Sequence, residues 1–248
     1  MNFFSLFKRK LIYTLKKKIS VDYDSYQGNS LDDLFFHYGS DKANIFKKKN
    51  QQGHGFSRFY ENKFRFLKNE KINILEIGSF AGASAVAFIK YLSNSKVFCF
   101  DINISNFKYS SKKIEVYGLD INDKTKVLKV LNEIFEKHKF EKFDFIIDDG
   151  SHYLSDILFS FNFFFKYLKK GGTYVIEDFK HPNYYQYNKN VDDILVDDLL
   201  ENIKRKKLFK SSFFNEENQT YLFKSIRKIE TYKGNLKDSD ICFIEKED

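Results

Sequence analysis

From residue 72 onward, the chain alternates short apolar runs with amphipathic segments. Apolar runs at residues 72–77, 96–101, 114–117, 143–148 and 173–177 predict five strands. The segments between them predict helices over residues 81–92, 124–138 and 154–169, the last of which Gly171 and Gly172 end. Strands and helices that alternate in this way predict a parallel sheet with helices on both faces.

Beyond residue 177 the pattern changes. A helix is predicted over residues 191–208, followed by strands over 225–232 and 240–245 with a Gly234-Asn235 turn signal between them. These two strands predict an antiparallel hairpin at the edge of the sheet. The expected fold class is therefore α/β: a doubly wound, Rossmann-like sheet of seven strands, mostly parallel, with a C-terminal antiparallel hairpin and a helical N-terminal extension.

Residues 1–70 precede the alternating pattern and predict a helical cap segment, with residues 71–248 as the main domain. Within residues 1–20, apolar side chains fall on one side of a helix and most lysines fall elsewhere. This favours a helix that packs on its own domain or on a second subunit; the alternative is a peripheral contact with an anionic membrane surface. The apolar residues of this side are Phe3, Phe4, Phe7, Leu11, Leu15 and Ile19.

Composition changes this picture little. Hydrophobic residues make up 42% and charged residues 31% of the chain, as in ordinary globular proteins. Lysine carries most of the net charge of +8 and no nucleic-acid motif accompanies it, so we expect no nucleic acid partner. Cys99 and Cys242 lie in apolar runs, and we expect neither a signal peptide nor a membrane span. The expected location is the cytoplasm, with the inner membrane face as a peripheral alternative.

The run from Glu76 to Ser84, Glu-Ile-Gly-Ser-Phe-Ala-Gly-Ala-Ser, joins the first strand to the next helix. Small residues at 78 and 82 allow a tight turn and a close ligand, and free N–H groups at the helix start suit a carboxylate. Asp101 ends the second strand, where an acidic residue accepts hydrogen bonds from ribose hydroxyls, and Asp120 is placed to meet an adenine edge. The predicted cofactor-binding residues are Glu76, Gly78, Ser79, Gly82, Ser84, Asp101, Asp120 and Asp148.

A second set of polar residues follows the strands at 143–148 and 173–177. These strands are expected to be neighbours, so Asp149, Glu177 and Asp178 should converge at their carboxyl ends. Three carboxylates repel one another unless a cation lies among them, and an all-oxygen set suits Mg²⁺ or Mn²⁺. The sequence therefore predicts a metal site.

His152 lies three residues after Asp149, in the loop beside this predicted site. A neutral imidazole can take a hydroxyl proton, and a metal ion makes that proton easier to remove. We therefore predict His152 and Asp149 as the catalytic residues. The alternative is that Asp148 and Asp149 cap the next helix and that His152 is simply exposed.

Together these motifs resemble the metal-dependent sugar O-methyltransferases that act on macrolide deoxysugars, and the cephalosporin hydroxylase-like proteins. The resemblance covers about residues 35–180, and Phe56 departs from it because the family often has Tyr there. It rests on Tyr38-Gly39-Ser40-Asp41-Lys42, His54-Gly55-Phe56 with Tyr60, Leu75-Glu76-Ile77-Gly78, Ile147-Asp148-Asp149-Gly150-Ser151-His152, and Ile176-Glu177-Asp178.

This resemblance implies an enzyme that uses S-adenosylmethionine (SAM) and Mg²⁺ or Mn²⁺ to methylate a sugar hydroxyl. Asp149, Glu177 and Asp178 would hold the metal and His152 would be the base. The acceptor would be a sugar or sugar nucleotide, in a bacterial surface polysaccharide or another glycoside, and the protein would be a homo-oligomer. Residues expected to contact the acceptor are Asp41, Lys42, His54, Tyr60 and His181.

Three other functions remain open. Catechol- or phenol-type O-methyltransferases also use Mg²⁺ and carboxylates at these strand ends. An NAD-dependent oxidoreductase shares the sheet, but the chain has G-x-x-x-G in place of G-x-G-x-x-G, and its terminal hairpin differs from a dehydrogenase, which continues with βα units. A non-catalytic membrane scaffold is suggested only by residues 1–20.

Overall fold

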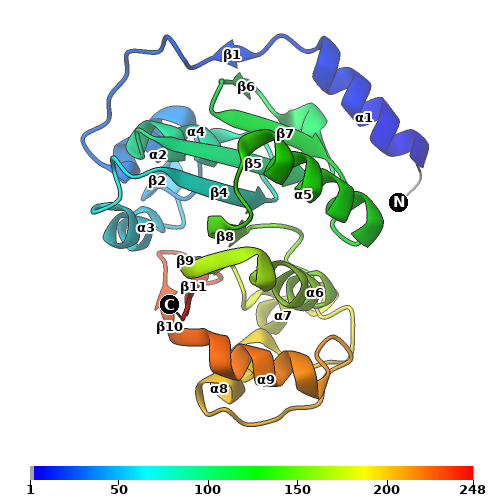
Figure 1. The fold of residues 1–248 in the computed structure, drawn as a ribbon. Helices are drawn as coiled ribbons and strands as arrows, with labels where there is room; N and C mark the ends of the chain where they lie inside the picture. The colour runs from blue at the N-terminus through cyan, green and yellow to red at the C-terminus, as the bar shows by residue number, and fades with distance from the viewer. Residues whose placement is uncertain (1–2, 248) are drawn as a thin grey trace. The chain divides into compact units, whose positions relative to one another are not determined.

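The predicted apolar runs form strands in the computed structural model, which describes residues 3–247 (Figure 1). The side chains of Phe3 and Phe4, which belong to the predicted apolar side of the first helix, lie outside the described residues. The chain divides into unit 1, Met1–Phe140, and unit 2, Glu141–Asp248. The predicted boundary at residues 70/71 stays a prediction.

Unit 1 is built on three parallel strands in the order β4-β5-β7. Every side chain of β4 (Ile72–Ile77) is buried, as expected for a strand covered on both faces. β5 (Ser95–Asp101) pairs with β4, and β7 (Ile114–Gly118) pairs with β5. The helices α4 (Ala83–Tyr91) and α5 (Lys124–His138) follow β4 and β7. The carboxyl ends of the three strands therefore lie at one edge of the sheet.

The N-terminal part of unit 1 consists mainly of short helices, together with three two-residue strands that the sequence did not predict. Ser30 and Asp33 form a capping box at the start of α2 (Leu31–Tyr38), which ends at Gly39 with φ of 80°. The aromatic core beneath it includes Phe35 and Phe88, whose ring centroids are 5.5 Å apart. The other elements of unit 1 are α1 (Phe3–Leu15), β1 (Ile19–Ser20), β2 (Ile45–Phe46), β3 (Gln51–Gln52), α3 (Ser57–Phe64), η1 (Ile104–Asn106) and β6 (Tyr109–Ser110).

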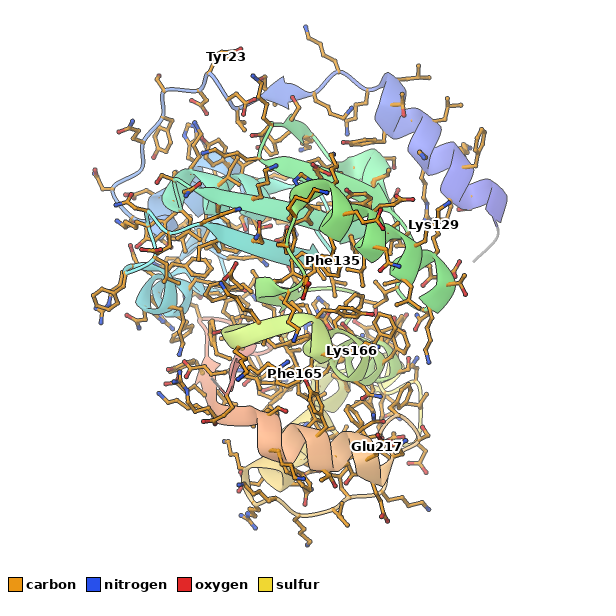
Figure 2. All side chains as sticks on the ribbon, in the orientation of Figure 1. Tyr23, Lys129, Phe135, Phe165, Lys166 and Glu217 are labelled. Atoms are coloured by element: carbon orange, nitrogen blue, oxygen red, sulfur yellow. The ribbon has the colours of Figure 1, made fainter. Side chains whose placement is uncertain are left out.

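Unit 2 contains four strands in the order β10-β11-β9-β8. β8 (Phe143–Asp148) and β9 (Leu168–Glu177) are parallel, whereas β11 (Asp240–Lys246) is antiparallel to both β9 and β10 (Ile226–Lys233). Phe165, labelled in Figure 2, lies in the core of unit 2 with its ring centroid 5.4 Å from that of Phe161. The helices of unit 2 are α6 (Leu154–Phe164), η2 (Phe165–Tyr167), α7 (His181–Tyr184), η3 (Gln186–Asn188), α8 (Val196–Lys204) and α9 (Glu216–Ser225).

The two units together contribute seven strands to the main architecture, three from unit 1 and four from unit 2. Parallel pairing in both units and the antiparallel pair β10 and β11 confirm the expected α/β, Rossmann-like fold with a C-terminal hairpin. None of the described helices combines the length and the apolar character that crossing a bilayer would require.

The prediction that Gly171 and Gly172 end a helix is wrong. α6 stops at Phe164, and both glycines lie inside β9. β8 has one residue, Asp144, opposite residues 169–172 of β9, so the glycines belong to a bulge. Gly171 has φ of 68°, and a Cβ on Gly172 would lie 2.8 Å from the Asp144 carbonyl oxygen. Glycine, which the sequence predicted as the end of a helix, therefore forms a strand bulge here.

The predicted helix over residues 191–208 is too long, and a second helix is missing from the prediction. Only Val196–Lys204 is helical in that segment, and α9 begins at Glu216. The Asn215 side chain caps α9 by accepting a hydrogen bond from the Asn218 N–H, with acidic residues in the first turn. This capping pattern is a signal from which the sequence could have indicated the helix.

Candidate functional site

The loop between β4 and α4 relies on left-handed backbone. Gly78, Phe80 and Gly82 have φ of 84°, 42° and 79°, of which only the glycines adopt such values without strain. A Cβ on Gly82 would lie 2.3 Å from Cζ of Phe107, so no side chain fits there. The two small residues that the sequence singled out are therefore required by the geometry of the turn.

Glu76 ties the strand to the following helix. Its side chain is fully buried, and its Oε1 accepts a hydrogen bond of 2.5 Å from the Ser84 hydroxyl of α4. Burial, together with the nearby Glu76 charge, raises the pKa of the Cys99 thiol well above its usual range. Ser79 is also buried, and its hydroxyl donates to the Glu76 carbonyl at 3.3 Å. The structure thus gives Glu76, Ser79 and Ser84 a role in holding the loop; their contact with a cofactor stays a prediction.

Asp101 holds two loops at once. Its Oδ2 accepts a hydrogen bond from the Phe80 N–H at 2.7 Å, and its Oδ1 accepts one from the Asn103 N–H at 2.6 Å. A carboxylate has about four lone-pair positions, so each oxygen keeps acceptor capacity for a ligand hydroxyl. Two large apolar side chains beside it, Phe80 and Ile102, are exposed by 63% and 40%. Sequence reasoning missed them, although apolar residues next to both motifs were a visible signal.

Asp120 lies in the turn that follows β7. Its Oδ1 accepts a hydrogen bond of 3.1 Å from the Asn122 N–H, and the neighbouring Leu119 N–H donates to the Asp101 carbonyl at 3.1 Å. The structure therefore places the predicted residues of unit 1, from Gly78 to Asp120, at the carboxyl ends of β4, β5 and β7. This is the edge at which doubly wound sheets bind nucleotides.

In unit 2, the structure brings Asp149, His152 and Asp178 together. We call these residues the carboxylate–histidine group; one ligand atom from each lies within 4.8 Å of the others. His152 Nε2 is 3.9 Å from Asp149 Oδ1. Glu177, predicted as a third carboxylate ligand, is buried at the end of β9 opposite Ile241 and is not among these three. Its role as a ligand stays a prediction.

Two members of this group have unusual backbone conformations. His152 and Asp178 have φ of 59° and 53°, in the left-handed region that side chains other than glycine rarely adopt. Such strain persists only where surrounding contacts hold it, and it gathers at functional sites. The backbone at these two positions therefore agrees with a site after β8 and β9.

Asp148 precedes the group at the end of β8 and is buried, with 4% of its surface exposed. Burial raises its pKa to about 7, against the opposing effect of hydrogen bonds from Ser160 and the Gly150 N–H. The carboxyl group thus faces α6 inside unit 2. Its predicted contact with the cofactor stays a prediction.

A row of four rings runs from the carboxylate–histidine group along α7 and η3. The ring centroids of His152 and His181 are 4.7 Å apart, those of His181 and Tyr185 5.1 Å, and those of Tyr185 and Tyr187 5.6 Å. Asp238 supports this aromatic row, since its Oδ2 lies 3.4 Å from His181 Nε2 and accepts a hydrogen bond from the Tyr185 hydroxyl. Tyr187 is 67% exposed. The sequence indicated His181 but missed the two tyrosines, which lie beyond the recognised motifs.

The predicted acceptor-contacting residues between Asp41 and Tyr60 are closely packed in unit 1. The His54 N–H donates to the Asp41 carbonyl at 2.7 Å, and the Lys42 side chain is buried. The Tyr60 ring is fully buried, with its centroid 5.3 Å from that of Phe88, so it belongs to the core here. The structure brings Asp41, Lys42 and His54 together; contact of any of these residues with an acceptor stays a prediction.

Residues 75–179 match the family model described as a methyltransferase domain. The matched segment begins in β4 and ends just after Asp178, so it contains the loop between β4 and α4, Asp101 and the carboxylate–histidine group. The resemblance of this segment to methyltransferases, predicted from the motifs, is therefore confirmed.

Two curated sugar O-methyltransferases are similar to the chain over part of their length. Demethylmacrocin O-methyltransferase of Streptomyces fradiae is 30% identical over 132 residues, which cover 50% of this chain and 32% of that protein. L-olivosyl-oleandolide 3-O-methyltransferase of Streptomyces antibioticus is 31% identical over 155 residues, which cover 60% of this chain and 36% of that protein. The chain thus spans only a minor part of these relatives.

A solved structure shares the fold over most of the chain. MycE methyltransferase from the mycinamycin biosynthetic pathway, in complex with Mg, SAH and mycinamycin VI, matches with a TM-score of 0.66 and 22% identity. The match covers 89% of this chain and 55% of MycE. The likeness therefore extends beyond residues 75–179 on both sides.

Proposed function

We propose that this protein is a SAM-dependent O-methyltransferase that requires Mg²⁺ or Mn²⁺ and methylates a sugar hydroxyl. The carboxylate–histidine group carries this proposal, because it lies within a methyltransferase domain and has the donors that a divalent cation needs. The names of the relatives, which describe methylation of macrolide and other glycoside sugars, support the acceptor class.

Asp149 and Asp178 fit a divalent cation. Their oxygens are hard donors, and ligands on opposite sides of Mg²⁺ are about 4 Å apart, comparable with the 4.8 Å that bounds this group. Glu177, the residue before Asp178, is proposed as a further ligand. A bound divalent cation supplies Lewis acidity, which makes an acceptor hydroxyl easier to deprotonate.

His152 is proposed as the base that takes the proton of the acceptor hydroxyl. Its Nε2 is the ring nitrogen that faces Asp149, and the nearby carboxylate stabilises the positive charge that the imidazole gains. The ring of His181 packs beside it and limits its orientation. His152 therefore offers an imidazole beside the carboxylates, packed against the ring of His181.

The loop after β4 and the Asp101 carboxylate are proposed to hold SAM. SAM supplies the methyl group as a sulfonium and leaves as S-adenosylhomocysteine. The left-handed turn at Gly78 and Gly82 lets a ligand approach the backbone, and the acceptor capacity of Asp101 suits ribose hydroxyls. Exposed Phe80 and Ile102 offer apolar surface for an adenine ring.

The aromatic row offers a surface on which a sugar acceptor could pack. The C–H faces of a sugar ring are apolar and pack on aromatic rings, whereas the hydroxyl groups at its edge remain available for hydrogen bonds. Tyr185 and Tyr187 have exposed rings, and they follow His181 in the row that begins at the proposed base. Within this class we propose a glycoside or a bacterial surface polysaccharide precursor, including sugar nucleotides. Assembly into a homo-oligomer stays a prediction.

The test is release of S-adenosylhomocysteine from SAM with sugar nucleotides, free glycosides and a catechol, each with Mg²⁺ and with EDTA. We expect turnover on a sugar that EDTA stops and Mg²⁺ restores. Turnover insensitive to EDTA would contradict the metal, and turnover on the catechol alone would contradict the sugar. Absence of S-adenosylhomocysteine binding in a thermal shift assay, with a shift by NAD instead, would contradict the methyltransferase.

A further inference from the structure

The first helix is attached to unit 1 by its polar face. Arg9 donates a hydrogen bond from Nη1 to the Ile102 carbonyl at 2.9 Å, and Lys16 donates from Nζ to the Ser105 carbonyl at 3.0 Å. Between them, the ring of Tyr13 meets that of Phe107 edge-on, with centroids 6.3 Å apart. Arg9 and Tyr13 of α1 and Lys16, the residue after it, recur at helical spacing, so they form one stripe that faces the segment after β5.

The apolar stripe of the same helix points the other way. Phe7, Leu11 and Leu15 recur every four residues and are exposed by 58%, 49% and 77%. This stripe is offset by two residues from that of Arg9 and Tyr13, which is about 200° around a helix. An amphipathic helix on a globular domain ordinarily buries its apolar stripe. The expectation that the apolar side of α1 packs on its own domain is therefore wrong for these residues.

Lysines border the exposed apolar stripe. Lys8 and Lys10 each lie one residue, about 100°, to either side of it, and Lys17 follows the helix. All three are exposed, and none of their ammonium groups has a hydrogen-bond or ion-pair partner among the described residues. Residues 3–20 contain no acidic side chain. Apolar residues flanked by lysines, whose stems can extend toward lipid headgroups, are typical of helices that lie in a membrane interface.

We propose that α1 docks this protein on an anionic phospholipid surface, with Phe7, Leu11 and Leu15 inserted among the acyl chains and Lys8, Lys10 and Lys17 against the headgroups. Charge complementarity favours lipid over a second copy of α1. Two such helices packed on each other would bring lysines toward lysines, with no acidic residue on either helix to pair with them. The inference does not depend on the acceptor or on the proposed chemistry.

Vesicle sedimentation of the full chain tests this inference. The vesicles contain phosphatidylglycerol and phosphatidylcholine in equal amounts, or phosphatidylcholine alone. The variant Phe7→Gln/Leu11→Gln/Leu15→Gln replaces the apolar stripe with residues of good helix propensity at exposed positions, so the fold is kept. Leu128→Gln, at a leucine that is 39% exposed on α5, is the matched control.

We expect the unchanged protein and Leu128→Gln to sediment with the anionic vesicles, less so at high salt, and only weakly with phosphatidylcholine. The triple variant should bind the anionic vesicles at least about tenfold more weakly. Two outcomes would overturn the inference: no sedimentation of the unchanged protein, or equal sedimentation of the triple variant. A fall in the solution mass of the triple variant by light scattering, without vesicle binding by the parent, would assign the stripe to a second copy.

Discussion

The loop after β4 in unit 1 and the carboxylate–histidine group in unit 2 are built in different ways. The loop is a backbone structure, in which glycines adopt left-handed turns and Asp101 accepts two main-chain N–H groups. The carboxylate–histidine group consists of side chains, two of which project from strained non-glycine backbone. A larger side chain in the loop after β4 should therefore lower the stability of the fold. Removal of a charge from the carboxylate–histidine group should lower activity with little change in stability.

The largest effect is expected for Asp149→Asn. The amide keeps the size of the side chain but removes the charge that a divalent cation needs, so turnover should fall by about 1,000-fold, or about 4 kcal/mol in activation free energy. Calorimetric Mg²⁺ or Mn²⁺ binding should weaken in parallel while the melting temperature stays close to that of the parent.

Asp192→Asn, at an exposed carboxylate elsewhere in unit 2, is the control and should keep both activity and metal binding. Normal metal affinity in Asp149→Asn would remove this residue from the proposed ligands. A large loss of stability would instead break the contrast between the two regions.

A smaller effect, and on stability, is expected for Gly82→Ala. The new Cβ would meet the Phe107 ring at 2.3 Å, and alanine is strained at φ of 79°. Strain and steric conflict together should lower the free energy of unfolding by about 3 kcal/mol, measured by urea denaturation.

Gly39→Ala measures the effect of backbone strain alone, so the difference between the two variants gives the steric part. Gly39 has φ of 80°, but the space that a Cβ would occupy is open, so strain alone applies and should cost about 1 kcal/mol. Equal losses in the two variants would show that the Phe107 ring moves aside easily and that Gly82 is not needed for space.

The smallest effect is expected for Tyr187→Ala, in the aromatic row. Loss of one exposed ring should raise KM for the sugar acceptor by about fivefold and leave kcat, metal binding and stability nearly unchanged. Tyr23→Ala, at a tyrosine that is 89% exposed in unit 1 and labelled in Figure 2, is the matched control. An unchanged KM in Tyr187→Ala would separate the outer part of the row from acceptor binding.

Much of the architecture is predictable because strands and helices here carry clear periodic patterns. The strands at 72–77 and 143–148 and the helix at 124–138 begin and end where predicted, since apolar runs and an amphipathic repeat define them. Gly171 and Gly172 misled the prediction because glycine serves both helix ends and strand bulges. Whether a glycine ends a helix or forms a bulge depends on the neighbouring strand, which lies elsewhere in the sequence.

The candidate site is predictable where its residues directly follow strands that pair with each other. Asp149 and Asp178 could be grouped because both follow parallel strands that pair with each other. His152 was predicted beside them because it follows Asp149 by three residues, and the structure groups all three. The left-handed backbone at His152 and Asp178 is a feature that the sequence pattern did not indicate. For α1, the sequence predicted an amphipathic helix, but its apolar side does not pack on its own domain, because Arg9 and Lys16 donate hydrogen bonds to carbonyl groups in and near η1.

The left-handed backbone at His152 and Asp178 also has an evolutionary consequence. Besides glycine, asparagine, aspartate and histidine occupy that region more readily than other residues, so the fold itself narrows the residues acceptable at these two positions, whatever the chemistry requires. Asp149 is under no such backbone restriction. In a duplicated copy released from selection for activity, position 149 would diversify freely, while positions 152 and 178 would stay within this small set of residue types. Inactive descendants would thus keep the backbone conformation of the site after losing its catalytic residues.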